Sequence, residues 1–285
     1  MNLSSAGQLL ALAFASCFAL LPVHGEAPVS AAPPAKLGST IFRFEDLAVK
    51  PSGVGERRDV ADQPTATLAR FECHISTLNP SRASHPPHTH PQEELIILRD
   101  GTLDVNVNGQ IQRVGPGSLF FFASNNPHAV QNNGEKPATY FVFNFATAAT
   151  KTPPAIGAPV APGQIGSTVM EWTKLPVQTT KTGERRAVLD SATATLANFE
   201  CHATTLNPGE TAHAPHRHAD EEVIFVREGQ VEVRLNGKTQ SVGSGAILFF
   251  ASNDEHGLKN TGTTAATYYV MRLKTEATPA PLAMK

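Results

Sequence analysis

The strongest constraint on this chain is a long internal repeat. Residues 39–147 align with residues 167–275 at a constant offset of 128 positions and without a gap. Within this alignment, residues 65–80 and 193–208 are identical at 13 of 16 positions. A repeat of this length is a whole domain and not a solenoid unit. The sequence therefore predicts two sister domains, each long enough to bury a core of its own.

The histidines follow the same repeat. Of the 11 histidines in the chain, only His24 has no counterpart 128 positions away. Because histidine is the commonest transition-metal ligand among side chains, two copies of one histidine constellation indicate two metal sites. The pairs are His74 and His202, His85 and His213, His88 and His216, His90 and His218, and His128 and His256.

Composition marks the ends of the two domains. Residues 26–38 and 150–166 are rich in proline, alanine and glycine. Such segments are typical of extended spacers and not of cores. We therefore place the domains at residues 39–149 and 167–276, followed by a tail at 277–285.

The N-terminus predicts a signal peptide over residues 1–25. The apolar run over residues 9–21 is too short to span a bilayer, and the small residues Val23 and Gly25 suit a cleavage site. No lysine or arginine precedes the run, which is unusual for a signal peptide. We expect export to the periplasm or the exterior, and a mature protein that is not integral to a membrane.

Charge excludes one class of partner. The net charge is −2, and both signs are scattered along the chain. A nucleic-acid-binding domain needs a basic stripe or patch, and the sequence has none. We therefore expect a small-molecule partner and no nucleic acid.

Short alternating runs between turn signals predict strands throughout. Residues 103–107 precede Asn108-Gly109, a pair that accepts the positive φ angles of a type I′ hairpin, and Asn236-Gly237 is its twin. The apolar runs at 119–122 and 247–250 are typical of strands buried on both faces. About ten strands per repeat predict an all-β fold of closed or double-sheet domains.

One stretch of each copy gathers potential metal ligands. If residues 88–94 form a regular strand, His88, His90 and Glu94 project to one face. His128 is the best candidate for a fourth ligand. Such a set leaves about two octahedral positions open and suits Mn(II) or Fe(II), with Zn(II) or Ni(II) possible, one ion in each copy. The second copy repeats the set as His216, His218, Glu222 and His256.

These residues resemble the two sequence motifs of the cupin family, and the resemblance covers nearly all of both repeats. It implies two tandem jelly-roll-like barrels of about six to eight strands, related by a pseudo-twofold, paired through exchanged strands and holding a divalent metal. The first motif is matched by His88, His90, Glu94 and Gly101, and by His216, His218, Glu222 and Gly229. The second motif is matched by Gly117, His128 and Asn132, and by Gly245, His256 and Asn260.

The chain departs from the family pattern at positions that shape the backbone. We therefore expect altered loops with an unaltered ligand set. Glycine is replaced by Arg82, Glu210, Asn125 and Asn253, and proline by Ala123 and Ala251.

Four further residues lie beside the candidate ligands. His85 and His213 come three residues before the first ligand and have opposite parity, so we place them on loops near the metal. They either move protons or hold a substrate carboxylate, or they simply bond a backbone carbonyl. Glu93 and Glu221 have the wrong parity for the metal, and we expect them to be exposed.

The strand at residues 68–76 alternates apolar and polar side chains. Glu72 and His74, with their twins Glu200 and His202, either orient the metal ligands or face solvent or an interface, and we favour the second interpretation.

Two further features recur in both copies. The Gly-Glu-Arg-Arg segments at 55–58 and 183–186 are expected to tie the two barrels together through Glu–Arg contacts, the alternative being a clamp for a carboxylate. Cys73 and Cys201 are expected to be small buried residues, the alternative being one disulfide.

Together these observations favour a metalloenzyme that performs oxidative cleavage or decarboxylation of a small oxygen-rich organic acid or related molecule. The resemblance includes the oxalate-degrading bicupins, but this chain has His85 and His213 where they carry an arginine. An isomerase or lyase acting on a sugar or sugar acid is one alternative, and a non-catalytic metal- or ligand-binding module is another. We expect either a monomer with an internal pseudo-dimer or a homo-oligomer.

Overall fold

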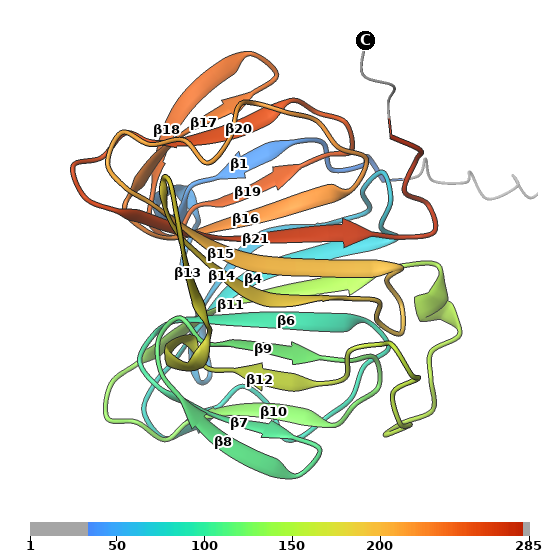
Figure 1. The fold of residues 1–285 in the computed structure, drawn as a ribbon. Helices are drawn as coiled ribbons and strands as arrows, with labels where there is room; N and C mark the ends of the chain where they lie inside the picture. The colour runs from blue at the N-terminus through green and yellow to red at the C-terminus, as the bar shows by residue number, and fades with distance from the viewer. Residues whose placement is uncertain (1–33, 282–285) are drawn as a thin grey trace, which may run out of the picture. The chain divides into compact units, whose positions relative to one another are not determined.

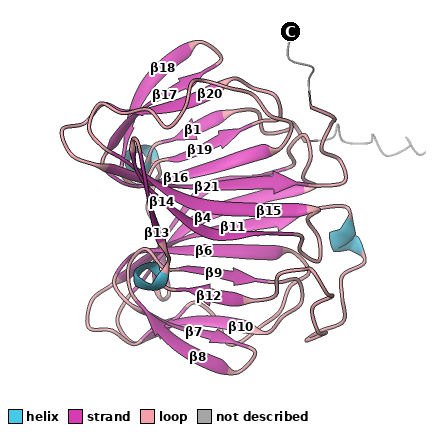
Figure 2. Cartoon of the chain, in the orientation of Figure 1, coloured by secondary structure: helices cyan, strands magenta, loops and turns pink. Residues whose placement is uncertain are grey.

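Strands make up almost all of the regular structure in a computed structural model that describes residues 34–281 (Figures 1 and 2). The remaining segments, 1–33 and 282–285, lie outside the described residues, and so do the predicted signal peptide and most of the predicted 26–38 spacer. Within residues 34–281 the helices are three short 3₁₀ turns, η1 (Phe44–Asp46), η2 (Ala149–Lys151) and η3 (Trp172–Lys174). The prediction of an all-β protein is confirmed.

Each half of the chain forms one large and one small sheet. The first large sheet has the order β12 (Thr168–Met170), β9 (Leu119–Phe122), β6 (Glu93–Asp100), β11 (Ala138–Ala146), β4 (Arg70–Leu78), β3 (Gly55–Gln63) and β2 (Lys50–Ser52). The small sheet beside it has the order β5 (Arg82–Ala83), β10 (His128–Asn132), β7 (Leu103–Val107) and β8 (Gln110–Val114).

The second half repeats this arrangement. Its large sheet has the order β1 (Thr40–Phe42), β19 (Ile247–Phe250), β16 (Glu221–Glu228), β21 (Ala266–Lys274), β15 (Asn198–Leu206), β14 (Gly183–Ser191) and β13 (Val177–Thr180). Its small sheet has the order β18 (Lys238–Gly243), β17 (Gln230–Leu235) and β20 (His256–Asn260). In each half the two sheets enclose an apolar core of their own.

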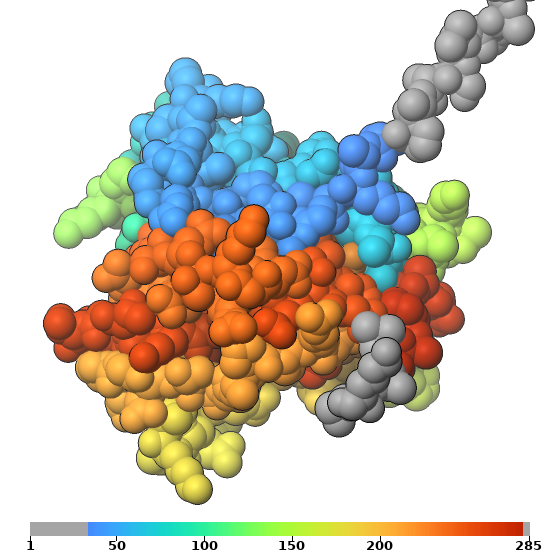
Figure 3. Space-filling model, turned by 90° about the horizontal axis from the view of Figure 1, so that it is seen from above, coloured from blue at the N-terminus to red at the C-terminus, as the bar shows by residue number. Residues whose placement is uncertain are grey.

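The two halves exchange their first strands. β1 precedes the first barrel in sequence but pairs with β19 of the second, and β12 pairs with β9 of the first. In the space-filling view the blue N-terminal residues accordingly lie against the orange residues of the second half (Figure 3). The exchange that the family resemblance implied is therefore present.

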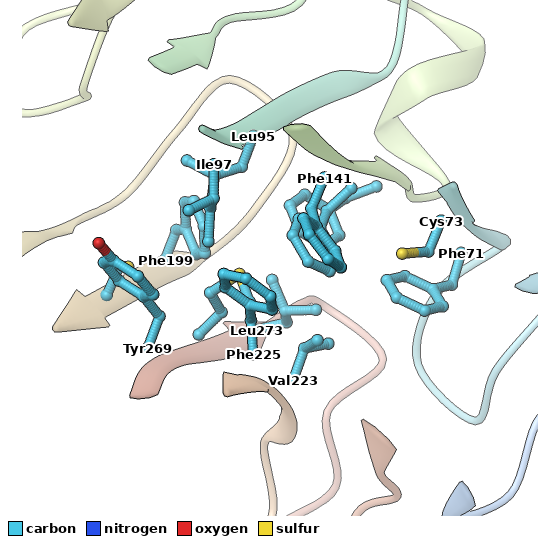
Figure 4. Packing of buried hydrophobic residues seen from close by; sticks show 14 of the residues in the cluster. Phe71, Cys73, Leu95, Ile97, Phe141, Phe199, Val223, Phe225, Tyr269 and Leu273 are labelled. Atoms are coloured by element: carbon cyan, nitrogen blue, oxygen red, sulfur yellow. The ribbon is translucent and has the colours of Figure 1, made fainter. Parts of the chain in front are cut away.

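A third, larger core joins the barrels. On β4 the apolar residues Phe71, Cys73 and Ile75 point away from their own barrel and into this shared core. Aromatic rings from both halves meet there, with the centroids of Phe141 and Phe225 4.2 Å apart (Figure 4). Aromatic side chains bury large apolar areas, so this shared core stabilises the pairing of the barrels.

Both described cysteines belong to this shared core. Cys73 and Cys201 are buried and free, as the interpretation of small buried residues predicted. Burial raises the pKa of each thiol well above its ordinary value, so both stay protonated.

The position of Glu93 and Glu221 corrects a prediction. We expected both to be exposed, but both are fully buried between the barrels. The parity argument was right, because neither faces its own cavity. The expectation of exposure was wrong because the other barrel, and not water, covers the outer face of this sheet.

Each of these glutamates accepts three hydrogen bonds from the other barrel. Glu93 Oε2 accepts from the hydroxyls of Thr193 at 2.5 Å and Thr195 at 2.8 Å, and its Oε1 accepts from the Ala194 N–H at 3.0 Å. Glu221 makes the same three bonds with residues 65–67, at 2.6, 3.0 and 2.7 Å. Burial raises the pKa of Glu93, although these bonds oppose the shift.

The Gly-Glu-Arg-Arg segments do not tie the barrels together, so that prediction was wrong. Arg57 bonds to Glu72 at 3.0 Å and Arg185 bonds to Glu200 at 3.1 Å, each within its own barrel. The reason is that β3 pairs with β4 of the same barrel, with Arg57 opposite Ser76, and the long Arg57 side chain reaches along β4 to Glu72.

Turn chemistry follows the sequence closely. Asn108 and Gly109 have φ angles of 49° and 86°, as a type I′ hairpin requires, and the twin pair behaves alike. Asn125 has a φ of 56°, which explains how the chain tolerates asparagine where the family has glycine. The spacer prediction was wrong for Leu37, which is only 6% exposed and packs into the shared core.

We predict that Glu93→Ala destabilises the protein strongly. The substitution leaves two hydroxyls and one backbone N–H of the other barrel buried without an acceptor, which costs about 3 kcal/mol or more. Urea unfolding followed by circular dichroism measures the loss. The control is Glu135→Ala, which removes an exposed carboxylate. Equal midpoints for the two variants would contradict a structural role for Glu93.

Candidate metal centre

Each barrel brings three imidazoles together. His88, His90 and His128 each offer a ring nitrogen within 4.8 Å of the others, and the same holds for His216, His218 and His256. His128 begins β10, whereas His88 and His90 lie in the segment before β6. The prediction that these residues converge is met in both copies.

The convergence has a different cause from the one expected. We predicted one regular strand over residues 88–94, but β6 begins only at Glu93. His88 is instead fixed to His128 by a two-residue antiparallel bridge, in which each N–H donates to the other carbonyl at 3.0 Å. The second copy has the same bridge between His216 and His256.

Backbone hydrogen bonds define the tautomer of several rings. His90 Nδ1 lies 2.8 Å from the Gln92 carbonyl, and His128 Nδ1 lies 2.8 Å from the Asn126 carbonyl. A carbonyl only accepts, so Nδ1 carries the proton and the Nε2 of the neutral ring keeps its lone pair. This is the arrangement by which proteins orient a histidine toward a metal. His218 and His256 make the equivalent bonds.

A buried carboxylate lies beside each trio. Glu94 places its oxygens 3.6 Å from His90 Nε2 and 3.8 Å from His128 Nε2. Glu222 is closer, at 3.2 Å from His218 Nε2 and 3.4 Å from His256 Nε2. Burial raises the pKa of both carboxyls, but their histidine partners lower it further, so both are ionised at neutral pH.

The donor set fits a cation. Nitrogen atoms of these rings are buried without a hydrogen-bond partner, namely His88 Nδ1, His90 Nε2 and His128 Nε2 in the first barrel. A buried polar atom without a partner is costly, and a buried carboxylate needs a counter-charge. One divalent ion would meet both needs, and three imidazoles with a carboxylate suit Mn(II), Fe(II), Zn(II) or Ni(II).

The two trios differ at one pair of equivalent histidines, His128 and His256. His128 stacks on Phe122 with centroids 4.2 Å apart, and burial lowers its pKa to about 4. Burial acts on His256 as well, but its hydrogen bond to the nearer Glu222 raises its pKa overall. The shorter contact in the second barrel is the physical reason for this difference.

Each trio opens into a cavity inside its own barrel. The volumes are about 190 Å³ in the first barrel and about 390 Å³ in the second. His74 and Arg57 line the first cavity, as His202 and Arg185 line the second. We favoured a solvent or interface position for this polar set, and that interpretation was wrong, because the other face of β4 holds the shared core.

The polar set does not touch the histidine trio either. Glu72 bonds to His74 Nδ1 at 2.7 Å, to Arg57 and to Asn144 Nδ2 at 2.8 Å. Glu200 bonds to His202 Nδ1 at 2.7 Å and to Arg185 in the second barrel. These residues therefore build the cavity wall and do not orient the trio directly.

His85 and His213 lie on exposed loops at the cavities, as predicted. Their ring centroids are 4.7 Å from that of His88 and 4.3 Å from that of His216, respectively. His213 Nδ1 lies 3.1 Å from the Ala214 carbonyl, and His85 Nδ1 lies 3.3 Å from the Ser84 hydroxyl. Both histidines line their cavities.

Our sequence analysis missed two polar residues at equivalent positions, Asn144 and Arg272, of which Arg272 lines the second cavity. Asn144 on β11 pairs with Glu72 on one side and with Glu94 on the other, and Arg272 holds the same place between Glu200 and Glu222. The available signal was a polar residue inside an otherwise apolar strand, at equivalent repeat positions.

The fold and the two sites define a class: a protein of two strand-exchanged β-barrels, each with a histidine-rich cavity able to hold a divalent metal. A cupin-domain family model matches residues 74–144 and 203–272. The chain therefore belongs to the cupin family, as a bicupin. A search of curated proteins found no significant match.

Solved structures agree on the fold. AerE from Microcystis aeruginosa superposes with a TM-score of 0.59 at 16% identity, covering 80% of this chain and 97% of that chain. The protein Ylba from E. coli gives a TM-score of 0.66 at 11% identity, covering 86% and 94%. A variant of Bacillus subtilis oxalate decarboxylase gives 0.63 at 14% identity, covering 85% and 79%. At such identities the likeness supports the fold alone.

None of the helices that the structure describes is long and apolar enough to cross a membrane.

We predict that His128 and His256, which hold equivalent positions in the two trios, titrate differently in the metal-free protein. As the pH falls from 8 to 5, His256 takes up a proton at a pH above 6.5, the ordinary pKa of histidine, because its own pKa is raised. His128 stays neutral until about pH 4. NMR of ring-labelled histidine measures both, with His128→Gln and His256→Gln as assignment controls. Titration of the two rings over the same pH range would contradict the difference in environment.

Proposed function

We propose that each barrel binds one divalent metal ion, Mn(II) or Fe(II) in preference to Zn(II) or Ni(II). The ligands are His88, His90, His128 and Glu94 in the first barrel, and His216, His218, His256 and Glu222 in the second. The observation that carries this proposal is the set of buried ring nitrogens without partners beside an ionised, buried carboxylate.

We further propose that the protein is a metalloenzyme acting on a small oxygen-rich organic acid or related molecule, by oxidative cleavage or decarboxylation. When bound, such a metal supplies Lewis acidity and open coordination positions next to the cavity. The cavity volumes suit only a small ligand. The oxalate decarboxylase among the structural neighbours acts on a compound of this class by its printed name, which supports the proposal without deciding it.

The chain's own residues divide the remaining work. Arg57 and Arg185 offer guanidinium N–H groups to substrate oxygens, and the apolar residues around them exclude water. His85 and His213 lie at the cavities with imidazoles that can take up or release a proton. Two alternatives would use the same cavities: an isomerase or lyase acting on a sugar or sugar acid, and a binding module without turnover. The experiments below distinguish them by their outcome.

We predict that single histidine substitutions halve the metal content. His88→Ala and His216→Ala should each retain one ion per chain, and the double variant none, because each removes a ligand from a different barrel. Elemental analysis after loading with Mn(II) and desalting measures this, with His74→Ala as a matched control that removes a cavity histidine outside the trio. Two ions per chain in the double variant would exclude these ligands.

We predict that His85→Ala combined with His213→Ala lowers turnover about a hundredfold and changes the pH profile, as expected when a general acid or base is lost. The assay is a screen of small organic acids with the metal-loaded protein. The metal content should be unchanged. An unaltered pH profile would remove these residues from the chemistry, and binding without turnover in the wild type would favour the binding module.

A further inference from the structure

The two cavities differ in one charged residue on their walls. The charged side chains that line the first cavity, apart from histidines, are Glu56, Arg57 and Glu94. Those that line the second are Glu184, Arg185, Glu222 and Arg272. Three of these positions correspond between the copies. Arg272 stands alone, because its counterpart Asn144 is neutral.

The difference between Asn144 and Arg272 changes the hydrogen bonds of the glutamates beside them in the sheet. In the first barrel Asn144 Nδ2 donates to Glu72 Oε2 at 2.8 Å, so this carboxylate oxygen is satisfied. In the second barrel Arg272 makes no such bond, and Glu200 Oε2 is buried without a partner. Arg272 therefore makes no hydrogen bond to the glutamate beside it.

Arg272 is held in place by a residue that also differs between the copies. Its Nη2 donates to Asp220 Oδ2 at 2.6 Å, and position 220 corresponds to Gln92 in the first barrel. The Asp220 carbonyl in turn accepts from His218 Nδ1 at 2.9 Å, which anchors the arginine beside the histidine trio. Asp220 thus orients the guanidinium next to the site.

Most of the donors of this guanidinium remain available. Among the described residues Arg272 makes one hydrogen bond, and its Nε is buried without a partner. A guanidinium has five N–H donors in a planar fork that matches a carboxylate. Arg272 is also 40% exposed in its side chain, which leaves it open to the cavity that it lines.

We propose that the second barrel binds a ligand with a carboxylate that pairs with Arg272, and that the first barrel does not select for this carboxylate. The two barrels of this protein then differ in substrate class, with Arg272 as the residue that decides it. This inference rests on the proposed function, since it concerns the ligand of the same metal cavity.

The test compares malonate with malonamide, two probes of similar size that differ in charge. Binding is measured by calorimetry on Mn(II)-loaded protein in the His88→Ala background, in which only the second barrel keeps its ligand set. Arg272→Asn copies the residue of the first barrel. We expect it to weaken malonate binding roughly tenfold to a hundredfold, the range for a lost charge-assisted hydrogen bond. Malonamide binding and manganese content should not change.

The matched control is Arg234→Asn. Arg234 also has an asparagine, Asn106, as its counterpart in the first barrel, but it bonds to Glu255 and does not line the cavity. This control should leave malonate binding unchanged. Arg272→Lys should keep part of the preference, which guards against a folding defect in the asparagine variant. The His216→Ala background should give a smaller preference for malonate, because only the first barrel is then loaded.

Unchanged malonate affinity in Arg272→Asn would overturn the inference and leave Arg272 as a structural partner of Asp220. The same holds if Arg234→Asn has an equal effect. Failure of the proposed function is separable, because it appears as absence of manganese in the elemental analysis. In that case the malonate and malonamide comparison is made on the metal-free protein, where Arg272→Asn must still reduce the preference for malonate.

Discussion

The contact between the barrels and the candidate metal site both depend on two neighbouring glutamates at the start of one strand in each barrel. In β6 the side chain of Glu93 points to the other barrel and that of Glu94 points into its own cavity, and β16 repeats this with Glu221 and Glu222. One strand start therefore carries both the contact between barrels and the candidate metal site. Because neighbouring residues in a strand cannot turn independently, the interface holds the position of the carboxylate in the site.

The pairing of two barrels explains the opposite character of the two faces of β4. β4 gives its apolar face to the shared core and its polar face to the cavity, so Cys73 and His74 have opposite surroundings. An isolated barrel would leave the apolar face of β4 in water, which is costly for so large an aromatic cluster. The exchanged strands β1 and β12 extend the same sheets across the boundary.

The sequence predicted the elements and the site because these depend on local chemistry. The Asn-Gly hairpins and the buried strand at 119–122 follow from residue type and spacing. The convergence of His88, His90 and His128 was predicted as well, but a backbone bridge between His88 and His128 produces it and not a regular strand. The sequence could not predict which part of the molecule covers each face of a sheet. Alternation correctly separated Glu93 from Glu94, but only the packing of the second barrel shows that Glu93 is buried. The Glu–Arg contacts failed for the same reason, because register and not composition decides which residues meet.

Duplication preserved the trio and changed its surroundings. The candidate ligands are identical in the two copies, whereas position 144 is asparagine in one and arginine in the other. A different residue beside an unchanged ligand set is what we expect when two copies keep one metal chemistry and diverge in the ligand they accept.

The central claim is that three imidazoles and one carboxylate grip a single ion in each barrel. Anomalous diffraction at the manganese edge from crystals loaded with Mn(II) tests it most directly. We expect two peaks per chain, one amid residues 88, 90, 94 and 128 and one amid residues 216, 218, 222 and 256. Ordered crystals with no peak at either position, or with manganese bound only elsewhere, would contradict it.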